Sequence, residues 1–426
     1  MGTLNTTVRF SARHISSDST ARGIYLTAMV RQTQYADKIH PDPPAPSDLD
    51  ATDTLAEPKR PPVQNKLLVT GLNAHNQLST HFTTTGQDLC SFTSIDAPLE
   101  AEHIELFHAS WSSTAIRVDN KVISIGNQTF TLTPDDIDVS DLFDAFGDHN
   151  GLLGCLSTDG RIWLLSDDQS QLECQADPDG SPRIGHIALA GNGRVAMTFK
   201  QAPNGRLCHV LSFESLDDLL AWYRDPANVP YDADMQHAMM QGRPTQLLAG
   251  TGTFLLRMES GEVYSWGDPR HQSLGRAISD APAERPAVIE ALGGLKITKV
   301  AIGGWLNAAV SEDGACYVWG AGTPGSDQTI KCLREADAGE LVLVQLHNDR
   351  DDGEPLDVVD VAVGDGHIVV LAEGNRCFVA GENRNGQGGL GHDQVFIDDW
   401  ARLALGSHHV RSIACGPKST FAHLHD

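Results

Sequence analysis

The sequence of 426 residues lacks any run of 18 or more apolar residues, and no apolar stretch of the secretory kind follows Met1. We therefore expect neither a membrane span nor a secretory signal. None of the eight cysteines forms a Cys-x-x-Cys pair. Cys155, Cys208, Cys316 and Cys377 fall inside apolar, strand-like runs, which predicts buried free thiols in a reducing compartment.

The sequence also lacks the usual signatures of catalysis. It contains no Gly-x-Ser-x-Gly, no phosphate-binding P-loop pattern, no His-Glu-x-x-His and no Gly-x-Gly-x-x-Gly after a predicted strand. The eighteen histidines do not fall at convincing metal-ligand spacings. We therefore expect a protein that is not an enzyme, with no catalytic residue, no cofactor and no metal.

Positive charge is scarce beyond the first sixty residues. Residues 1–60 carry seven Lys/Arg and seven Asp/Glu, whereas residues 61–426 carry 24 and 49, so the formal net charge of −25 belongs to the body of the chain. Because no basic cluster is present there, we expect no direct binding of nucleic acid. The acidity favours a protein partner with a basic surface, and solubility alone is the alternative explanation.

Residues 1–62 are predicted to form a flexible N-terminal extension, since residues 37–62 are rich in proline and acids. Residues 1–31 contain four arginines and a single acid, Asp18, as mitochondrial presequences do, and the first residues match a myristoylation pattern. We expect a cytoplasmic and/or nuclear protein, and mitochondrial targeting by residues 1–31 is the minor alternative.

A unit of short strands and tight turns repeats along residues 63–426. In the copies at 106–126, 247–267, 300–320 and 361–381, eleven positions separate a small residue from a hairpin residue, and six more lead to a glycine. The hairpin position holds Gly or Asn, which tolerate positive φ. Two looser copies occupy 143–213. The small residues are Ala109, Gly250, Gly303 and Gly364, the hairpin residues are Asn120, Gly261, Gly314 and Asn375, and the closing glycines are Gly126, Gly267, Gly320 and Gly381.

Each copy predicts three apolar strands joined by a small-residue turn and a hairpin, and such sheets bury both faces when they stack in a ring. The chain ends with the first half of a unit, at Gly416 and the strand after it, whereas residues 66–78 supply a second half. The sequence therefore predicts an all-β, seven-bladed β-propeller whose N- and C-terminal strands share one blade. We expect it to be a monomeric ring.

Two insertions interrupt the repeats, at 214–244 and 323–356. In the first, Ser215 can cap a short helix that Pro226 ends. Its apolar residues share one face, which predicts packing against the ring or, alternatively, binding of a partner. These residues are Leu216, Leu219, Leu220 and Tyr223.

The loops at 70–78, 265–275 and 380–391, together with residues 303–320, resemble the repeat of the regulator of chromosome condensation family. Residues 108–115 and 414–421 resemble the small single-propeller members most. This family is best known for nucleotide exchange on a Ran-type GTPase and for association with chromatin. Other small members resemble binding subunits of modification enzymes, including JmjC-type oxygenases.

The resemblance places the turns after the first strands around the mouth of a central channel, which makes them candidates for partner binding. Among them only His367 keeps the histidine that the family usually has three residues after the turn glycine. With Asp365 it could transfer protons, or it could hydrogen-bond adjacent blades. The predicted partner-binding residues are Trp111, Asn150, Arg194, Trp305, Asn307, Asp365, His367 and Lys418. For Trp111 and Trp305, packing within the blades is the alternative.

These observations favour a non-catalytic, protein-binding propeller that acts as a regulatory or scaffold subunit, for example of a chromatin- or translation-related modification enzyme. The alternative is a guanine-nucleotide exchange factor for a Ran-like small GTPase. A propeller enzyme is less favoured, because only Asp365, His367 and Arg194 are available at the mouth.

Overall fold

The computed structural model describes residues 66–425 of the unit Arg60–Asp426, apart from short gaps. The predictions about the N-terminal extension, residues 1–62, therefore lie outside the described residues. The gaps are residues 80–85, 96–100, 102, 134–137, 167–170, 176–182, 201–204, 226–235, 280, 323–324, 327, 338, 348–354, 392–393 and 407.

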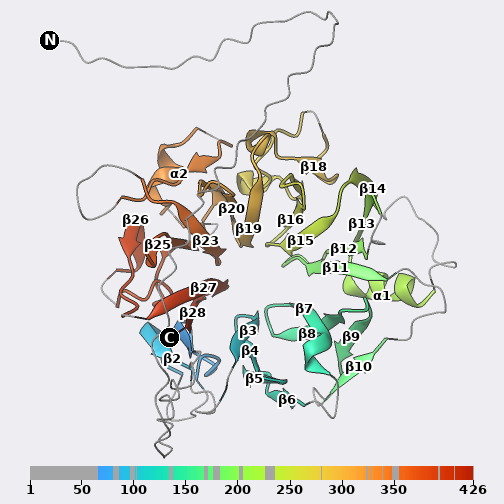
Figure 1. Cartoon of the computed structure of the whole chain (residues 1–426), viewed down its shortest axis with the longest axis horizontal. Coiled ribbons are helices and arrows are strands. Elements are labelled where there is room, and N and C mark those ends of the chain that lie inside the picture. The colour runs from blue at the N-terminus through green and yellow to red at the C-terminus, as the bar shows by residue number, and fades with distance from the viewer. Residues whose placement is uncertain are drawn as a thin grey trace, which may run out of the picture. The chain divides into compact units, whose positions relative to one another are not determined.

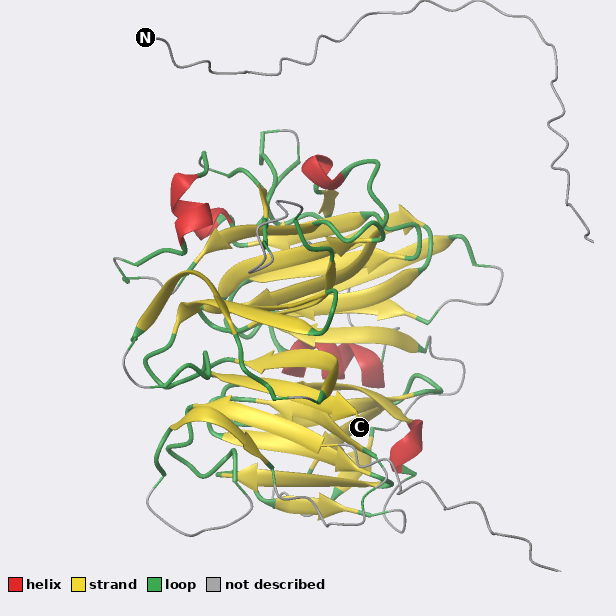
Figure 2. Cartoon of the chain, turned by 60° about the vertical axis from the view of Figure 1, so that its left-hand side comes forward, coloured by secondary structure: helices red, strands yellow, loops and turns green. Residues whose placement is uncertain are grey.

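Seven four-stranded antiparallel sheets are arranged radially around a centre (Figure 1), which confirms the predicted propeller. Strands make up most of the described structure, and the few helices are short (Figure 2). Blade 1 contains β3 (Ile104–Ala109), β4 (Ser113–Val118), β5 (Lys121–Gly126) and β6 (Phe130–Leu132); blade 2 contains β7 (Leu142–Gly147), β8 (Leu152–Ser157), β9 (Ile162–Leu165) and β10 (Leu172–Cys174); blade 3 contains β11 (Ile184–Leu189), β12 (Val195–Phe199), β13 (Leu207–Phe213) and β14 (Gln236–Gln241).

The next three blades follow the same order, with the first strand of each nearest the centre and short helical turns in the connections (Figure 1). Blade 4 contains β15 (Pro244–Ala249), β16 (Thr253–Met258), β17 (Val263–Gly267) and β18 (Ala287–Val288); blade 5 contains β19 (Ile297–Gly303), β20 (Trp305–Ser311), β21 (Cys316–Ala321) and β22 (Val342–Leu343); blade 6 contains β23 (Val358–Val363), β24 (His367–Ala372), β25 (Arg376–Glu382) and β26 (Phe396–Arg402). The 3-10 turns are η1 (Val139–Asp141), η2 (Arg270–Gln272) and η3 (Glu290–Leu292).

Blade 7 is shared between the two ends of the described chain, as the sequence predicts. Its strands run in the order β2 (Leu89–Ser94), β1 (Lys66–Gly71), β28 (Ser419–His425) and β27 (His409–Gly416). β1 pairs with β28 in a continuous register from Lys66↔Leu424 to Gly71↔Ser419. Backbone hydrogen bonds between segments that are more than 340 residues apart in sequence therefore close the ring.

The hairpin positions adopt the backbone conformation that their residue types predict. Gly261, Gly314 and Asn375 have φ values of +94°, +83° and +60°. In blade 1 the residue with positive φ is Asp119, at +51°, rather than the expected Asn120. Aspartate also tolerates this conformation, so the turn is shifted by one residue without loss of the hairpin.

The core lies between blades rather than inside them. All seven residues of β20 and all six of β24 are buried, because each faces a neighbouring sheet on both sides. One cluster joins residues of blades 5 and 6, and others join blades 3 and 4 or blades 7 and 1. The predicted buried thiols Cys155, Cys208, Cys316 and Cys377 lie in these layers and are free.

Loops after the third strands also fasten one blade to the next. The Gln77 Nε2 amide, in the loop of blade 7, donates to the Trp111 carbonyl of blade 1 at 2.9 Å. Gln128 of blade 1 donates to the Leu152 carbonyl of blade 2 and accepts from the Leu152 N–H, each at 2.9 Å. These glutamines satisfy backbone groups that the ends of the sheets leave unpaired.

Blades 2 and 3, whose repeats are faint in the sequence, are joined by a helix. α1 (Leu216–Arg224) begins at Ser215, whose hydroxyl accepts from the Asp218 N–H. Leu219, Leu220, Trp222 and Tyr223 are buried in one cluster with residues of blades 2 and 3, which confirms packing against the ring.

Both predicted insertions contribute outer strands to the ring. The range 214–244 contains α1 and β14, and 323–356 contains α2 (Lys331–Glu335) and β22. α2 lies against β26 through ion pairs, with Lys331 Nζ 2.9 Å from Asp399 and Arg334 Nη1 2.7 Å from Asp398. In the described part of the chain, no helix is long and apolar enough to cross a membrane.

Candidate partner-binding site at the channel mouth

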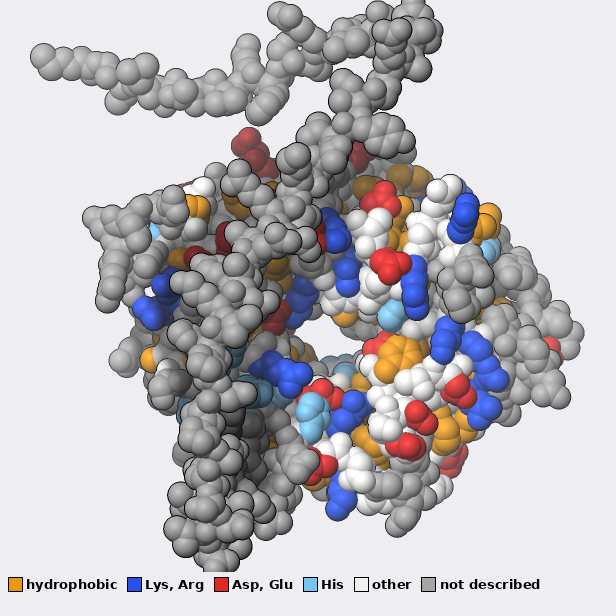
Figure 3. Space-filling model, viewed as in Figure 1, with side chains coloured by type: hydrophobic (Ala, Val, Ile, Leu, Met, Phe, Trp, Pro, Cys, Tyr) orange, Lys and Arg blue, Asp and Glu red, His pale blue; other side chains and the backbone are white. Residues whose placement is uncertain are grey.

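The seven turns between first and second strands meet around one cavity of about 910 Å³. Figure 3 shows an opening at the centre of the ring, with acidic, basic and histidine side chains around it. The expected convergence of these turns is therefore observed. They contribute lining residues from 109–111, 147–149, 189–193, 249–251, 302–304, 363–365 and 415–417.

Backbone groups tie neighbouring turns together at this mouth. The Gly191 N–H donates to the Gly250 carbonyl at 3.0 Å, and the Thr251 N–H donates to the Gly304 carbonyl at 2.8 Å. A Cβ atom on Gly303 would lie 2.5 Å from the Val363 carbonyl oxygen, so only glycine allows this approach. Eight of the lining residues are glycine, so turn backbone forms a large part of the wall beside side chains such as those of Trp111, Asp148 and Asp365.

Trp111 and Asp365 line this cavity, and Lys418 lies beside both of them, at the junction of blades 1, 7 and 6. Trp111 is 44% exposed, and Lys418 Nζ lies 5.6 Å from the centre of its ring. The same ammonium donates to the Asp365 carbonyl at 2.9 Å and lies 3.5 Å from its carboxylate. The lysine is thus held between an aromatic face and a carboxylate.

Asn150 and Arg194 are accessible as well. Asn150 is exposed, and its N–H donates to Asp148 Oδ1 at 2.7 Å. Arg194 Nη2 lies 2.7 Å from Glu214 Oε1, and a side-chain exposure of 22% leaves part of the guanidinium in solvent. Five of the eight predicted residues therefore lie at an accessible surface.

The other three predicted residues are buried, so they do not contact a partner in this conformation. Trp305 is 7% exposed, and Asn307 and His367 are 0% exposed. Trp305 and His367 open the second strands of their blades and Asn307 follows two residues later, where side chains point between blades. The expectation that these three side chains are available at the channel mouth is not met, and Trp305 takes the alternative position, in the packing between blades.

His367 serves the packing of blades 6 and 7. Its Nε2 lies 3.1 Å from the Thr420 hydroxyl of β28. Burial, with Lys418 nearby, lowers the pKa of His367 to about 3. The ring is therefore neutral at physiological pH and bridges two blades, as one of the two interpretations of the sequence expected.

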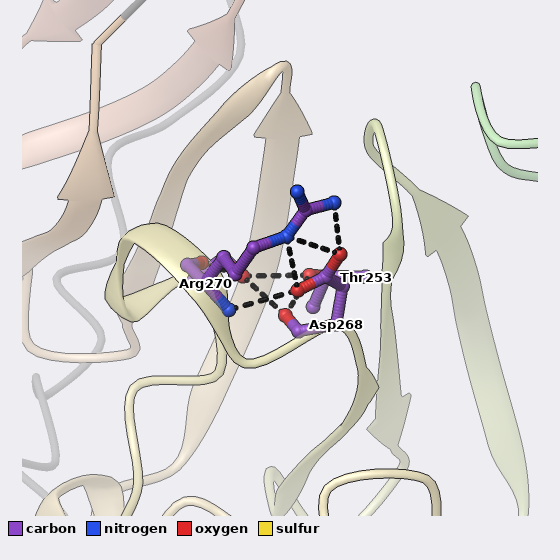
Figure 4. A network of polar contacts seen from close by, with 4 residues as sticks. Thr253, Asp268 and Arg270 are labelled. Carbon is purple, nitrogen blue, oxygen red and sulfur yellow. Dashed lines mark hydrogen bonds and ion pairs between the residues drawn. The ribbon is translucent and has the colours of Figure 1, made fainter. Parts of the chain in front are cut away.

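A loop of blade 4 adds residues that the sequence analysis did not select. Arg270 Nη2 lies 2.6 Å from Asp268 Oδ2, and Arg270 Nε bonds both carboxylate oxygens (Figure 4). Its guanidinium carbon lies 5.4 Å from the Trp305 ring centre, and the His271 ring centre lies 4.8 Å from that of Trp305. The signal in the sequence was the Asp-x-Arg-His order in a loop already noted for its resemblance.

Asp148 and His108 also line the mouth without having been predicted. The Asp148 carboxylate accepts from the Asn150 and Gly151 N–H groups, at 2.7 and 3.3 Å. Burial lowers the pKa of His108 to about 4, and the nearby Asp148 only partly offsets that shift. Near pH 7 the imidazole of His108 is therefore neutral.

Among the described residues, no three or more His, Cys, Asp or Glu side chains form a group that could hold a metal ion. The accessible groups in and beside the mouth are an indole, carboxylates, the imidazole of His149, and cations that each pair with an acid. This set can bind a charged or aromatic group reversibly, and it assembles no nucleophile beside a base.

Comparison with known proteins identifies the repeat. Two models described as the regulator of chromosome condensation (RCC1) repeat match residues 260–310 and 358–387. The first match runs from the hairpin of blade 4 into β20 of blade 5, and the second covers the first three strands of blade 6 up to the following loop.

Curated relatives match the chain over part of its length. RCC1 domain-containing protein 1 is 30% identical over 215 residues in Homo sapiens, which covers 42% of this chain and 56% of that protein. The Mus musculus protein of this name is 31% identical over 213 residues, covering 42% and 55%. E3 ubiquitin-protein ligase HERC2 of Mus musculus is 30% identical over 182 residues, covering 41% of this chain and 3% of that protein. The chain thus spans about half the length of the first two relatives.

The fold is shared with the solved structure of Prp20p from Saccharomyces cerevisiae. The TM-score is 0.59 at 14% identity, and the match covers 85% of this chain and 91% of that chain. At this identity the likeness shows the architecture only. The model matches show that the chain carries regulator of chromosome condensation repeats at residues 260–310 and 358–387, on a seven-bladed β-propeller.

Proposed function

We propose that this propeller is a non-catalytic binding protein that holds a basic protein partner at its channel mouth, as a regulatory or scaffold subunit of a chromatin- or translation-related modification enzyme. The observation that carries the proposal is the mouth itself. Turns from seven blades surround a cavity of about 910 Å³, with Trp111 exposed beside it and the carboxylates of Asp148 and Asp365 on its wall. Exposed aromatic residues in such positions are frequent anchors of protein interfaces.

The charge of the chain supports a basic partner. The formal net charge is −25. The cations around the mouth are already paired, Arg194 with Glu214, Arg270 with Asp268 and Lys418 with Asp365. The field of the chain therefore attracts basic surfaces and raises their rate of association.

Relatives support a role within larger assemblies. HERC2 is an E3 ubiquitin-protein ligase in which the matched part is 3% of the protein. Prp20p, which has the same architecture, is described with its binding to Gsp1p and histones. Repeats of this kind thus occur both inside a modification enzyme and in a propeller that binds basic proteins.

Affinity purification of the tagged chain from its native cells, followed by mass spectrometry, tests the proposal. We expect a stoichiometric protein partner with a basic surface, and its recovery should fall as salt screens the attraction. The purified chain should also bind core histones, used as a basic protein probe, in physiological salt. The absence of both a stoichiometric partner and histone binding would refute the proposal.

A second candidate is guanine-nucleotide exchange on a Ran-like small GTPase. It is favoured by the family resemblance and by the architecture shared with Prp20p. Release of a fluorescent guanine nucleotide from a panel of Ran-like GTPases measures this activity directly. No acceleration by the purified chain across the panel removes this candidate.

We place the protein in the cytoplasm and/or nucleus as a monomeric ring, without direct contact to nucleic acid or membrane. Fluorescent fusions of the full chain and of a chain without residues 1–31 would test the compartment. Mitochondrial fluorescence that requires residues 1–31 would contradict it. Light scattering on the purified chain should give the mass of one copy.

A further inference from the structure

We propose that the channel mouth binds one lysine or arginine side chain of the basic partner, inserted between Trp111 and the carboxylates of Asp148 and Asp365. The inference rests on the proposed function and specifies the part of the partner that this site recognises. Three features of the mouth carry it: its shape, its charge and the position of its tryptophan.

The shape of the mouth, open at the centre of the ring, admits a long side chain. The cavity has a volume of about 910 Å³, and much of its wall is turn backbone. Asp365 Oδ1 would lie 2.5 Å from a Cβ atom on Gly304, and the Gly416 carbonyl would lie 2.7 Å from one on Gly364. These contacts close the wall between neighbouring turns, so a ligand side chain can enter only from the open mouth and not between blades.

The charge favours a cation over an anion. Asp148 accepts three hydrogen bonds from its own turn, two at Oδ1 and one at Oδ2 from the Asn150 amide at 3.3 Å. Its carboxylate keeps a free acceptor position, since two oxygens offer about four. Lys418 is held by the backbone carbonyl and the carboxylate of Asp365, so it is a poor receptor for an incoming anion.

Trp111 supplies the aromatic surface that such a cation prefers. Lys418 already lies 5.6 Å from the ring centre, which shows that this indole accepts a cation in the field of the mouth. At 44% exposure the ring keeps accessible surface, while the Trp111 carbonyl is fixed by Gln77 at 2.9 Å. A lysine or arginine that stacks on a partly desolvated indole gains more than one at an open surface.

The test uses the full chain and a fluorescein-labelled peptide of sequence Gly-Gly-Arg-Gly-Gly-Arg-Gly-Gly, followed by fluorescence anisotropy in physiological salt. The control peptide carries citrulline, a neutral isostere, in place of both arginines. We expect the arginine peptide to bind at least tenfold more tightly, because citrulline keeps the shape and loses the charge.

Three variants locate the binding. Trp111→Ala, Asp148→Asn and Asp365→Asn should each lower the affinity for the arginine peptide by about three- to tenfold, the range expected for loss of one cation–π or charge-assisted contact. Glu259→Gln changes net charge by the same amount at an exposed hairpin of blade 4, and Phe143→Ala removes an aromatic ring that is also 44% exposed. Both controls should bind as the unmodified chain does.

The results separate this inference from the proposed function. Circular dichroism melting first establishes that each variant is folded, and Trp111→Phe should keep part of the affinity, since a ring remains. If the three mouth variants bind core histones and the arginine peptide as tightly as the unmodified chain, the inference is overturned and the proposed function stands. Equal binding of the citrulline peptide overturns it too. A rise in the mass of the chain with concentration that Trp111→Ala abolishes would assign the mouth to a second copy instead.

Discussion

Glycine residues at the channel mouth let the turns of neighbouring blades approach each other closely. A Cβ atom on Gly303 would meet the carbonyl oxygens of Val363 and Gly364 at 2.5 and 2.6 Å, and those atoms belong to the next blade. Neither oxygen can move without shifting its own turn. The spacing of blades 5 and 6 at their inner ends therefore depends on the absence of a side chain.

Gly303→Ala should consequently reduce stability. Forcing a methyl group into a closed contact costs about 1–3 kcal/mol, and we expect a loss of that size in the free energy of unfolding measured with denaturant. The matched control is Gly322→Ala, where the nearest atom to the added Cβ is the Gln328 carbonyl at 3.8 Å. Equal stability of the two variants would show that the blades adjust freely at the mouth.

His367 makes the stability of the ring depend on pH. Its folded pKa of about 3 lies below the ordinary value of 6.5, because the neutral ring is buried between blades. Between these two pH values the unfolded chain binds the proton and the folded chain does not. The contribution of His367 to the free energy of unfolding is therefore fully present above pH 6.5 and is lost as the pH falls. His108, whose pKa burial also lowers, likewise destabilises the folded chain at acidic pH. Burial raises the pKa of Asp144 to about 6, so protonation of Asp144 below that pH favours the folded chain and opposes the two histidines.

We expect His367 alone to remove about 2 kcal/mol between pH 7 and pH 5. His367→Gln should lower stability at pH 7, since the Thr420 contact changes, and should flatten the loss between pH 7 and pH 5 by about that amount. Denaturant unfolding of both proteins at each pH measures it. Parallel pH dependences would mean that His367 is not the titrating group.

The residues of the candidate site illustrate what a single sequence can reveal. The positions of the turns could be predicted from the sequence, because glycine and a fixed spacing mark them. The direction of each side chain could not. Trp305 begins a strand and packs between blades, whereas Trp111 lies within its turn and is exposed. Residues such as Arg270 depend on contacts with another blade that no local spacing encodes.

Elements were predictable to the extent that their signals are local. Hairpins with Gly or Asn, apolar strands and the Ser215 cap all appear in the structure as expected. The outer, fourth strand of each blade was missed, because the repeat marks only three apolar strands and the outer strands lie beyond the loops that follow them. The role of Trp222 was also missed, since α1 buries it against Phe199 and Phe213 of blade 3.

α1 packs across the seam of blades 2 and 3, and this gives a prediction at the level of the element. Trp222→Ala should destabilise the chain by about 3–5 kcal/mol, as removal of a buried aromatic ring does. Ala221→Ser, on the exposed side of the helix, should change stability by less than about 0.5 kcal/mol. Thermal or denaturant unfolding compares them, and a small effect of Trp222→Ala would show that α1 does not support the seam of blades 2 and 3.

At the scale of the whole molecule, the closure of the ring was the most secure prediction, because it followed from two half-units at the ends of the repeats. β1 and β28 form six consecutive pairs. The other seams between consecutive blades are crossed by a covalent connection of the chain. The blade that contains both ends is therefore the one whose backbone ladder holds the ring together.

A circular permutant tests whether the ladder between β1 and β28 holds the ring closed. An Asn-Gly turn after His425 can join it to residue 65, which completes blade 7 as a hairpin like the others, while new ends are opened between Asp351 and Asp352. The permutant should fold, since every strand is retained. Its ring is then closed at the seam of blades 5 and 6 by apolar packing, the Lys299–Asp360 ion pair and the hydrogen bond from the Val358 N–H to the Gly314 carbonyl, without a shared strand ladder. We expect the permutant to unfold at least about tenfold faster in denaturant. This ratio corresponds to a lowering of the unfolding barrier by about 1.4 kcal/mol, close to the net contribution of one hydrogen bond of that ladder.

The control is a chain in the original order without residues 1–59, which should unfold at the unmodified rate. If permutant and control unfold equally fast, packing between blades suffices to close the ring, and the pairing of the two ends serves only to place them.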